Sequence, residues 1–167
     1  MRQSADTIKK ISLELGGNAP LIVFDDADLT EAVEGAIASK YRNAGQTCVC
    51  ANRMFVQSGI HDKFVAALAE KVAEMKVGDG FEEGVVQGPI IDQQGFDKIE
   101  RHIADATAKG GVVVTGGKPH EKGGTFYQPT VLTGATRDMQ LFSEETFGPV
   151  AALFKFDKEE DAIAAAN

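Results

Sequence analysis

The sequence predicts an α/β domain with an open, mainly parallel sheet flanked by helices. Strand-sized apolar runs alternate along the chain with segments of helical periodicity, a pattern typical of parallel sheets covered by helices. The 167 residues are 43% hydrophobic and 25% charged, a composition typical of a globular protein with one sizeable core. No internal repeat or linker divides the chain, so we expect a single domain.

The first two predicted strands flank a glycine bend. Residues Ser12–Leu15 and Pro20–Phe24 are expected to be short buried strands on either side of Gly16-Gly17-Asn18, where glycine permits backbone angles closed to other residues. Asp28 is a good helix N-cap, with a glutamate three positions later and apolar residues at helical spacing after it. We therefore expect a helix that ends near Asn43.

The middle of the chain continues the alternation. The pattern RMFVQ after Asn52 indicates a strand, and a second helix should end before Gly78. The segment GDGFEEGVVQGPIID predicts an irregular connection to a third helix, which Gly110-Gly111 should stop. Val112–Thr115 is expected to be the next strand.

The last third of the chain begins with a loop of glycine and proline. Thr130–Leu132 and Val150–Phe156 are strand candidates, and a final helix should start after Asp157. The helical run DAIAAAN reaches Asn167 without a glycine or proline stop signal, so we expect the chain to be cut from a longer protein.

Charge and hydropathy exclude several classes of partner. The chain has 17 basic and 25 acidic residues, a formal net charge of −8, and the lysines are too scattered to form a face for nucleic acid. The longest apolar runs are far shorter than the roughly 20 residues that span a bilayer, so no membrane partner is expected. The opening MRQSADTIKK lacks the apolar stretch of a secretory signal, which favours a cytoplasmic location.

The string NAGQTCVCANR contains a candidate nucleophile. Cys48 lies in a polar, glycine-containing loop between a predicted helix and a predicted strand, where a side chain can reach a cleft. The thiolate is the reactive form of cysteine and needs nearby positive charge or amide donors, and Arg42 lies six residues earlier. The alternative is that Cys48 is a small buried hydrophobic residue.

A candidate general base lies in the string LELGG. Glu14 stands between two leucines, and an apolar setting would raise the pKa of its carboxyl towards neutrality, which suits a base. The alternative is a salt bridge at the edge of a strand. Either way, the two glycines that follow would let other groups approach closely.

Three motifs together carry a family resemblance. LELGGNAP, NAGQTCVCANR and EETFGPV, in this order, resemble the aldehyde dehydrogenase superfamily over essentially the whole chain. The variant QTCVC, with Arg42 ahead of it, is most similar to the succinate-semialdehyde dehydrogenases. The resemblance implies that Cys48 attacks the aldehyde to give a thiohemiacetal, that hydride passes to NADP or NAD, and that Glu14 activates the water that hydrolyses the thioester.

The resemblance also implies further residues and boundaries. Glu145 would bind the ribose of the nicotinamide, Phe147 would lie near the nicotinamide ring, and Arg42 would bind the carboxylate of succinic semialdehyde. Residues 1–167 would be the catalytic domain alone. Most of the dinucleotide-binding domain and the C-terminal oligomerisation segment would lie outside the chain, as would an oxyanion-binding Asn. The whole protein would be a homo-oligomer, a dimer or a tetramer.

Three other hypotheses remain open on the sequence alone. Cys50 could be a redox partner of Cys48, although cysteines two apart on a straight strand have Cα atoms ~6.8 Å apart, so the loop must bend. One of His61, His102 and His120 could activate Cys48 in a thiol hydrolase. These histidines are expected at a helix start, on a polar helix face and in a loop, so no metal site is predicted. Finally, the chain could be a folded module without turnover.

Overall fold

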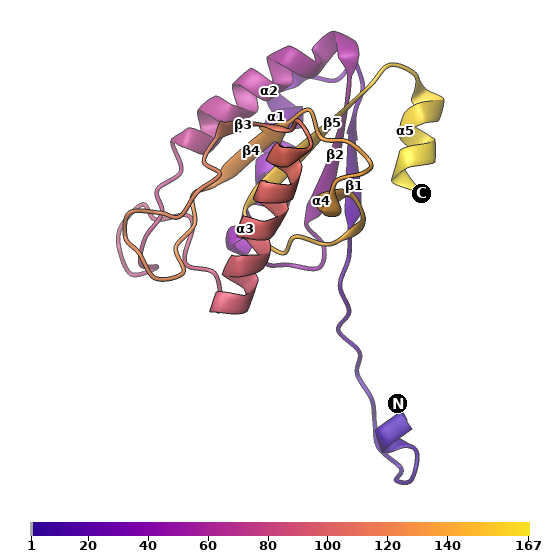
Figure 1. The fold of residues 1–167 in the computed structure, drawn as a ribbon, viewed down its shortest axis with the longest axis vertical. Helices are drawn as coiled ribbons and strands as arrows, with labels where there is room; N and C mark the ends of the chain where they lie inside the picture. The colour runs from indigo at the N-terminus through magenta and orange to yellow at the C-terminus, as the bar shows by residue number, and fades with distance from the viewer. Residues whose placement is uncertain (1) are drawn as a thin grey trace.

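The computed structural model describes residues 2–167 and contains one five-stranded sheet (Figure 1). The strands, in spatial order, are β1 (Ala19–Val23), β2 (Ala51–Gln57), β5 (Val150–Phe156), β4 (Thr130–Thr133) and β3 (Val112–Thr115). The first four are parallel to their neighbours, and β3 pairs antiparallel with β4. The predicted α/β fold with a mainly parallel sheet is confirmed.

All but one of the α-helices lie in the order that the sequence predicts. The helices are α1 (Leu29–Lys40), α2 (Ser58–Ala73), α3 (Gln93–Ala108), α4 (Gln140–Ser143) and α5 (Glu159–Ala166), with 3-10 turns η1 (Arg2–Ser4) and η2 (Arg42–Gly45). Asp28 caps α1 as predicted, because its Oδ1 accepts from the backbone N–H groups of Thr30 and Glu31 at 2.9 and 3.0 Å. No helix within residues 2–167 is long and apolar enough to cross a membrane.

The core consists of two apolar layers, one on each face of the sheet. Alternate residues of β5 point to opposite faces, so Leu153 packs in the layer under α1 and α2, while Phe154 packs in the layer under α3. Figure 1 shows α3 crossing in front of the sheet and α2 on the far side. Because both faces are covered, the central strands β2 and β5 are almost entirely buried.

The prediction of a buried strand at Ser12–Leu15 is wrong. This segment forms no strand, and its side chains are exposed, Leu13 at 58% and Leu15 at 71%. It belongs to the extended N-terminal stretch that leaves the body of the molecule in Figure 1. An apolar run becomes a buried strand only if another strand pairs with it, and none of the five strands in residues 2–167 does so.

Two local details also differ from the prediction. Helix α1 ends at Lys40 rather than near Asn43, because the backbone turns left-handed at Asn43 and Ala44, with φ of 51° and 54°. The short helix α4 was not predicted, since four residues carry no readable period. Its first backbone N–H donates to Asp105 Oδ2 at 2.7 Å, so a tertiary contact holds it.

Candidate active site

Cys48 lies exposed on the loop between α1 and β2, as predicted. The η2 turn redirects the chain into this loop, and Gly45, at φ 71°, packs so closely on the backbone carbonyl of Gly148 that no side chain could fit there. The backbone N–H of Cys50 then donates to Thr47 O at 3.1 Å, which makes residues 47–50 a turn. The thiol of Cys48 therefore stands on a tightly bent loop fixed at both ends.

Gly16 and Gly17 pass between the Cys48 loop and Glu145. The N–H of Gly17 donates to Glu145 Oε1 at 3.1 Å, and a Cβ on Gly17 would collide with the carbonyl oxygen of Cys48. A Cβ on Gly16 would lie 2.6 Å from Glu145 Oε2. The fold thus brings together the glycines of LELGG, the cysteine of QTCVC and the second glutamate of EETFGPV, which are far apart in sequence.

Glu14 lies on the exposed N-terminal stretch, three residues before Gly17. Its carboxylate forms no hydrogen bond or ion pair with any residue of the described part of the chain, so neither the apolar setting nor the salt bridge considered from the sequence is observed. Three extended residues span about 10 Å at most, which keeps Glu14 within reach of the Cys48 loop. The structure brings its glycine neighbours to the site, but not its carboxylate.

Arg42 begins the η2 turn and is exposed. It borders a hollow of about 250 Å³ whose other walls include Tyr41, Met75 and Val86. Within residues 2–167 the guanidinium donates no hydrogen bond, so the last carbonyls of α1 do not occupy it. Arg42 is therefore a cation with its donors available at the start of the turn that leads into the loop of Cys48.

Glu145 and Phe147 lie on the loop between α4 and β5. Phe147 has φ of 54°, which is rare for a bulky residue and costs about 1–3 kcal/mol. It borders a hollow of about 440 Å³ that Gln46, Ile90 and Thr125 also line. An aromatic ring held in a strained conformation at the edge of a hollow is suited to contact a ligand there.

Below the Cys48 loop lies a buried polar cluster that the sequence did not reveal. Lys40 is fully buried, and its Nζ donates to Asn52 Oδ1 at 2.7 Å. Burial lowers the pKa of Lys40 to about 8, against the opposing effects of the nearby Cys50 and Glu145. Asn52 Nδ2 in turn donates to Gly17 O at 3.5 Å, so the cluster supports the glycine segment of the site.

Cys50 is also buried, with its sulfur 2.6 Å from Thr47 Oγ1 and donating to Lys40 O at 3.7 Å. Both cysteines are free thiols in this structure. The turn at residues 47–50 supplies the bend that a linkage between Cys48 and Cys50 requires.

The three histidines lie apart from Cys48. His61 contacts Asp62 and Thr133, and the ring of His120 accepts from a backbone N–H in its own loop. The expectation of a polar helix face for His102 is wrong, because its side chain is fully buried between α3 and the loop of Glu145. Since no histidine hydrogen-bonds Cys48 in the described residues, the geometry does not favour a thiol hydrolase.

No metal site is found in the part of the chain that the structure describes, where no three potential ligands cluster.

Asn18 is structural, as its side-chain amide donates to Phe142 O at 2.9 Å.

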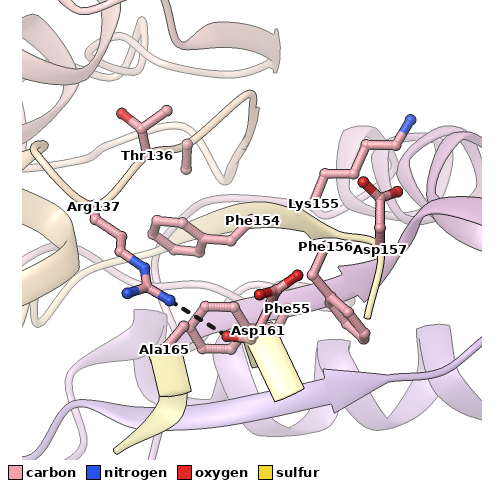
Figure 2. Close-up of a pocket in the computed structure, with 10 residues that line it drawn as sticks. Phe55, Thr136, Arg137, Phe154, Lys155, Phe156, Asp157, Asp161 and Ala165 are labelled. Carbon is pink, nitrogen blue, oxygen red and sulfur yellow. Dashed lines mark hydrogen bonds between the residues drawn. The ribbon is translucent and has the colours of Figure 1, made fainter. Parts of the chain in front are cut away.

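Another cavity, of about 410 Å³, lies elsewhere, between β5 and α5 (Figure 2). Phe154, Phe156 and Asp161 line it, and Arg137 donates to the backbone carbonyl of Asp161 at 3.3 Å. Gly17, Cys48 and Glu145 do not line this cavity, so the candidate active site lies elsewhere.

Comparison with known proteins identifies the family. The model of the aldehyde dehydrogenase family matches residues 1–167. The chain is 59% identical to the NADP⁺ succinate-semialdehyde dehydrogenase of Escherichia coli and 55% identical to the 3-sulfolactaldehyde dehydrogenase of Pseudomonas putida. These matches cover 100% and 99% of this chain, and 35% and 34% of the two relatives.

Among solved structures, succinate-semialdehyde dehydrogenase from Burkholderia pseudomallei superposes with a TM-score of 0.95 at 58% identity. That match covers 99% of this chain and 34% of the other. The chain thus spans about a third of the length of the proteins it matches. On the matched motifs, the shared fold and this similarity, the chain belongs to the aldehyde dehydrogenase family.

Proposed function

We propose that the protein carrying this chain oxidises an aldehyde with a carboxylate at its far end, succinic semialdehyde to succinate, with NADP or NAD. The observation that carries the proposal is the meeting of three segments at an exposed thiol: Gly17 packs on the Cys48 carbonyl and donates to Glu145. Membership of the family and the 59% identity to a succinate-semialdehyde dehydrogenase support the same reaction.

In the proposed reaction Cys48 gives up its proton to solvent, and its sulfur attacks the aldehyde carbon to form a thiohemiacetal. The backbone N–H of Cys48 has no hydrogen-bond partner in residues 2–167, so it is available to donate to the developing oxyanion. When bound, the nicotinamide supplies the acceptor for the hydride that leaves this carbon. The acyl group then remains on Cys48 as a thioester.

Glu14 would complete the cycle as a general base. It removes a proton from water, whose oxygen attacks the thioester carbon. The C–S bond then breaks, the carboxylic acid is released, and Glu14 returns the proton to the Cys48 sulfur to restore the thiol. The exposed carboxylate must come closer to the Cys48 loop than the structure shows, and the extended segment before Gly17 allows this movement.

Glu145, Gly16 and Phe147 fit the nicotinamide half of a dinucleotide. One oxygen of the Glu145 carboxylate accepts from Gly17, which leaves Oε2 able to accept from a ribose hydroxyl. Because Gly16 has no side chain, there is space beside this oxygen. We propose that Glu145 binds the ribose and that Phe147 contacts the nicotinamide ring.

Arg42 would select the substrate. A guanidinium binds a carboxylate through two parallel hydrogen bonds, and the exposed Arg42, at the start of the turn that leads into the Cys48 loop, has its donors available. The names of the two relatives cited above describe aldehydes that both carry an anionic group, a carboxylate in one and a sulfonate in the other. We therefore assign the anionic end of the substrate to Arg42.

We further propose that residues 1–167 form the catalytic domain, which works within a cytoplasmic homo-oligomer, a dimer or a tetramer. A reducing compartment suits the chemistry, because it keeps the Cys48 thiol free. The contacts that would distinguish NADP from NAD lie at the adenosine ribose, outside the residues assigned here.

The test compares two cysteine variants of the native protein. Succinic semialdehyde and either cofactor should give a reduced cofactor with the wild type, and Cys48→Ala should abolish this turnover. Cys50→Ala, which changes a buried thiol of the same loop, should keep most of it. A Cys48→Ala variant that retains wild-type turnover would refute the proposed nucleophile.

A further inference from the structure

Helix α3 holds the loop of Glu145 through a buried histidine. Glu145 has one neighbour on each side that touches His102: Nδ1 of the ring lies 3.1 Å from Thr146 Oγ1, and Nε2 lies 3.4 Å from Glu144 Oε2. The His102 side chain is fully buried, whereas that of Glu144 is 49% exposed. One rigid ring therefore fixes both residues that flank the carboxylate.

A second contact from the same helix holds the end of this loop. Gly148 packs so closely on Ile99, one turn before His102, that a Cβ would lie 2.5 Å from Ile99 Cδ1. Between the two contacts stands Phe147 in its left-handed conformation. A strained residue persists only where its surroundings fix it, so the two contacts from α3 account for the shape of this loop.

The chemistry of the ring matches its two neighbours. Burial lowers the pKa of His102, as do Lys98 and Arg101, while Glu144 opposes the shift. A neutral imidazole has one donor and one acceptor. A carboxylate only accepts, so Nε2–H donates to Glu144, and Nδ1 accepts from the hydroxyl of Thr146. Each polar atom of the buried ring is thereby satisfied.

We propose that His102 is a positioning residue that places the Glu145 carboxylate for the cofactor. The inference rests on the proposed function, because it needs Glu145 to bind the nicotinamide ribose. His102 does not touch the cofactor in this account. It acts through Glu144 and Thr146, while the Gly17 N–H fixes Glu145 from the opposite side.

The experiment measures binding of oxidised cofactor to the native protein, without aldehyde. His102→Phe keeps a flat ring but loses both polar contacts, and we expect the Kd of the preferred cofactor to rise about ten-fold. Thr146→Val removes only one hydroxyl from a side chain of the same shape, and a rise of about three-fold is expected. Alkylation of Cys48 by iodoacetamide without cofactor should proceed at the wild-type rate in both variants.

His61→Phe is the matched control. His61 is also a buried helical histidine with two polar contacts, but it lies on α2, on the other side of the sheet. This substitution should lower Tm and leave the cofactor Kd unchanged, because a merely structural change does not alter the affinity of the folded molecules.

Two results would overturn the inference. One is a cofactor Kd that equals the wild-type value in both His102→Phe and Thr146→Val. If His102→Phe does not fold, a wild-type Kd in Thr146→Val alone has the same meaning. The other is an equal rise in Kd for His61→Phe. Failure of the proposed function has a different signature, since the wild type would then bind neither NADP nor NAD.

Discussion

Because burial destabilises the charged form of Lys40, the protein should become more stable as the pH rises from neutral to about 10 and Lys40 loses its proton. The side chain is fully buried, with Asn52 Oδ1 as its acceptor, and burial holds its pKa at about 8, below the 10.5 of an exposed lysine. Between these two values the unfolded chain carries more protons on Lys40 than the folded chain does. The free energy of unfolding therefore increases with pH in this window.

The magnitude follows from the two pKa values. A shift of one unit corresponds to about 1.4 kcal/mol, so the charged Lys40 costs the fold about 3 kcal/mol at neutral pH. Integrating the titration from pH 7 to pH 10 recovers roughly 2–3 kcal/mol of this cost. Below pH 7 both states are protonated at Lys40, and this contribution no longer changes.

The assay is urea unfolding of the wild type and of Lys40→Met at several pH values and constant ionic strength. Burial raises the pKa of Tyr41 and Tyr127, but these hydroxyls contribute equally to both proteins and cancel in the difference. The free energy of unfolding of the wild type, relative to that of Lys40→Met, should rise by roughly 2–3 kcal/mol between pH 7 and pH 10. A difference that is flat over this range would refute a buried, charged Lys40.

Three further predictions concern the site and the chain as a whole. Arg42→Leu should reduce kcat/KM for succinic semialdehyde by about ten- to a hundred-fold and leave an uncharged aldehyde of similar length nearly unaffected, and equal losses on both substrates would assign Arg42 a structural role. Hydrogen peroxide should inactivate the native protein by joining Cys48 and Cys50. Peptide mapping that finds no linkage reversible by dithiothreitol would exclude this redox role for Cys50. The isolated 167-residue chain should reduce no cofactor in the presence of aldehyde, because the acceptor would not be held in place, and robust turnover by it would contradict the proposed domain assignment.

Local patterns were enough to predict most of the fold. Asp28 lies in a capping sequence, and the apolar runs of β2 and β5 are buried on both faces, so their signals lie within a few residues of chain. Ser12–Leu15 shows the limit of such signals. Its apolar residues resemble a strand, but pairing depends on a partner strand, and the sequence of the segment does not contain that information.

The candidate site was predicted in part, for the same reason. Cys48 was expected on an exposed loop because glycine and polar residues surround it, and the structure places it there. The burial of His102 and of Lys40 was not predicted, because each lies on an otherwise ordinary helix. Their burial depends on a second segment that is distant in sequence, the loop of Glu145 for one and Asn52 for the other.

The central claim, that Cys48 carries the acyl group during aldehyde oxidation, is tested most directly by trapping that intermediate. Glu14→Gln should slow hydrolysis of the thioester without preventing its formation, because the amide cannot take a proton from water. We predict that rapid acid quenching of this variant, mixed with succinic semialdehyde and cofactor, yields a Cys48 peptide heavier by one succinyl group, with one reduced cofactor formed per site. A burst of reduced cofactor with an unmodified Cys48 peptide, or a succinyl group on another residue, would contradict the account.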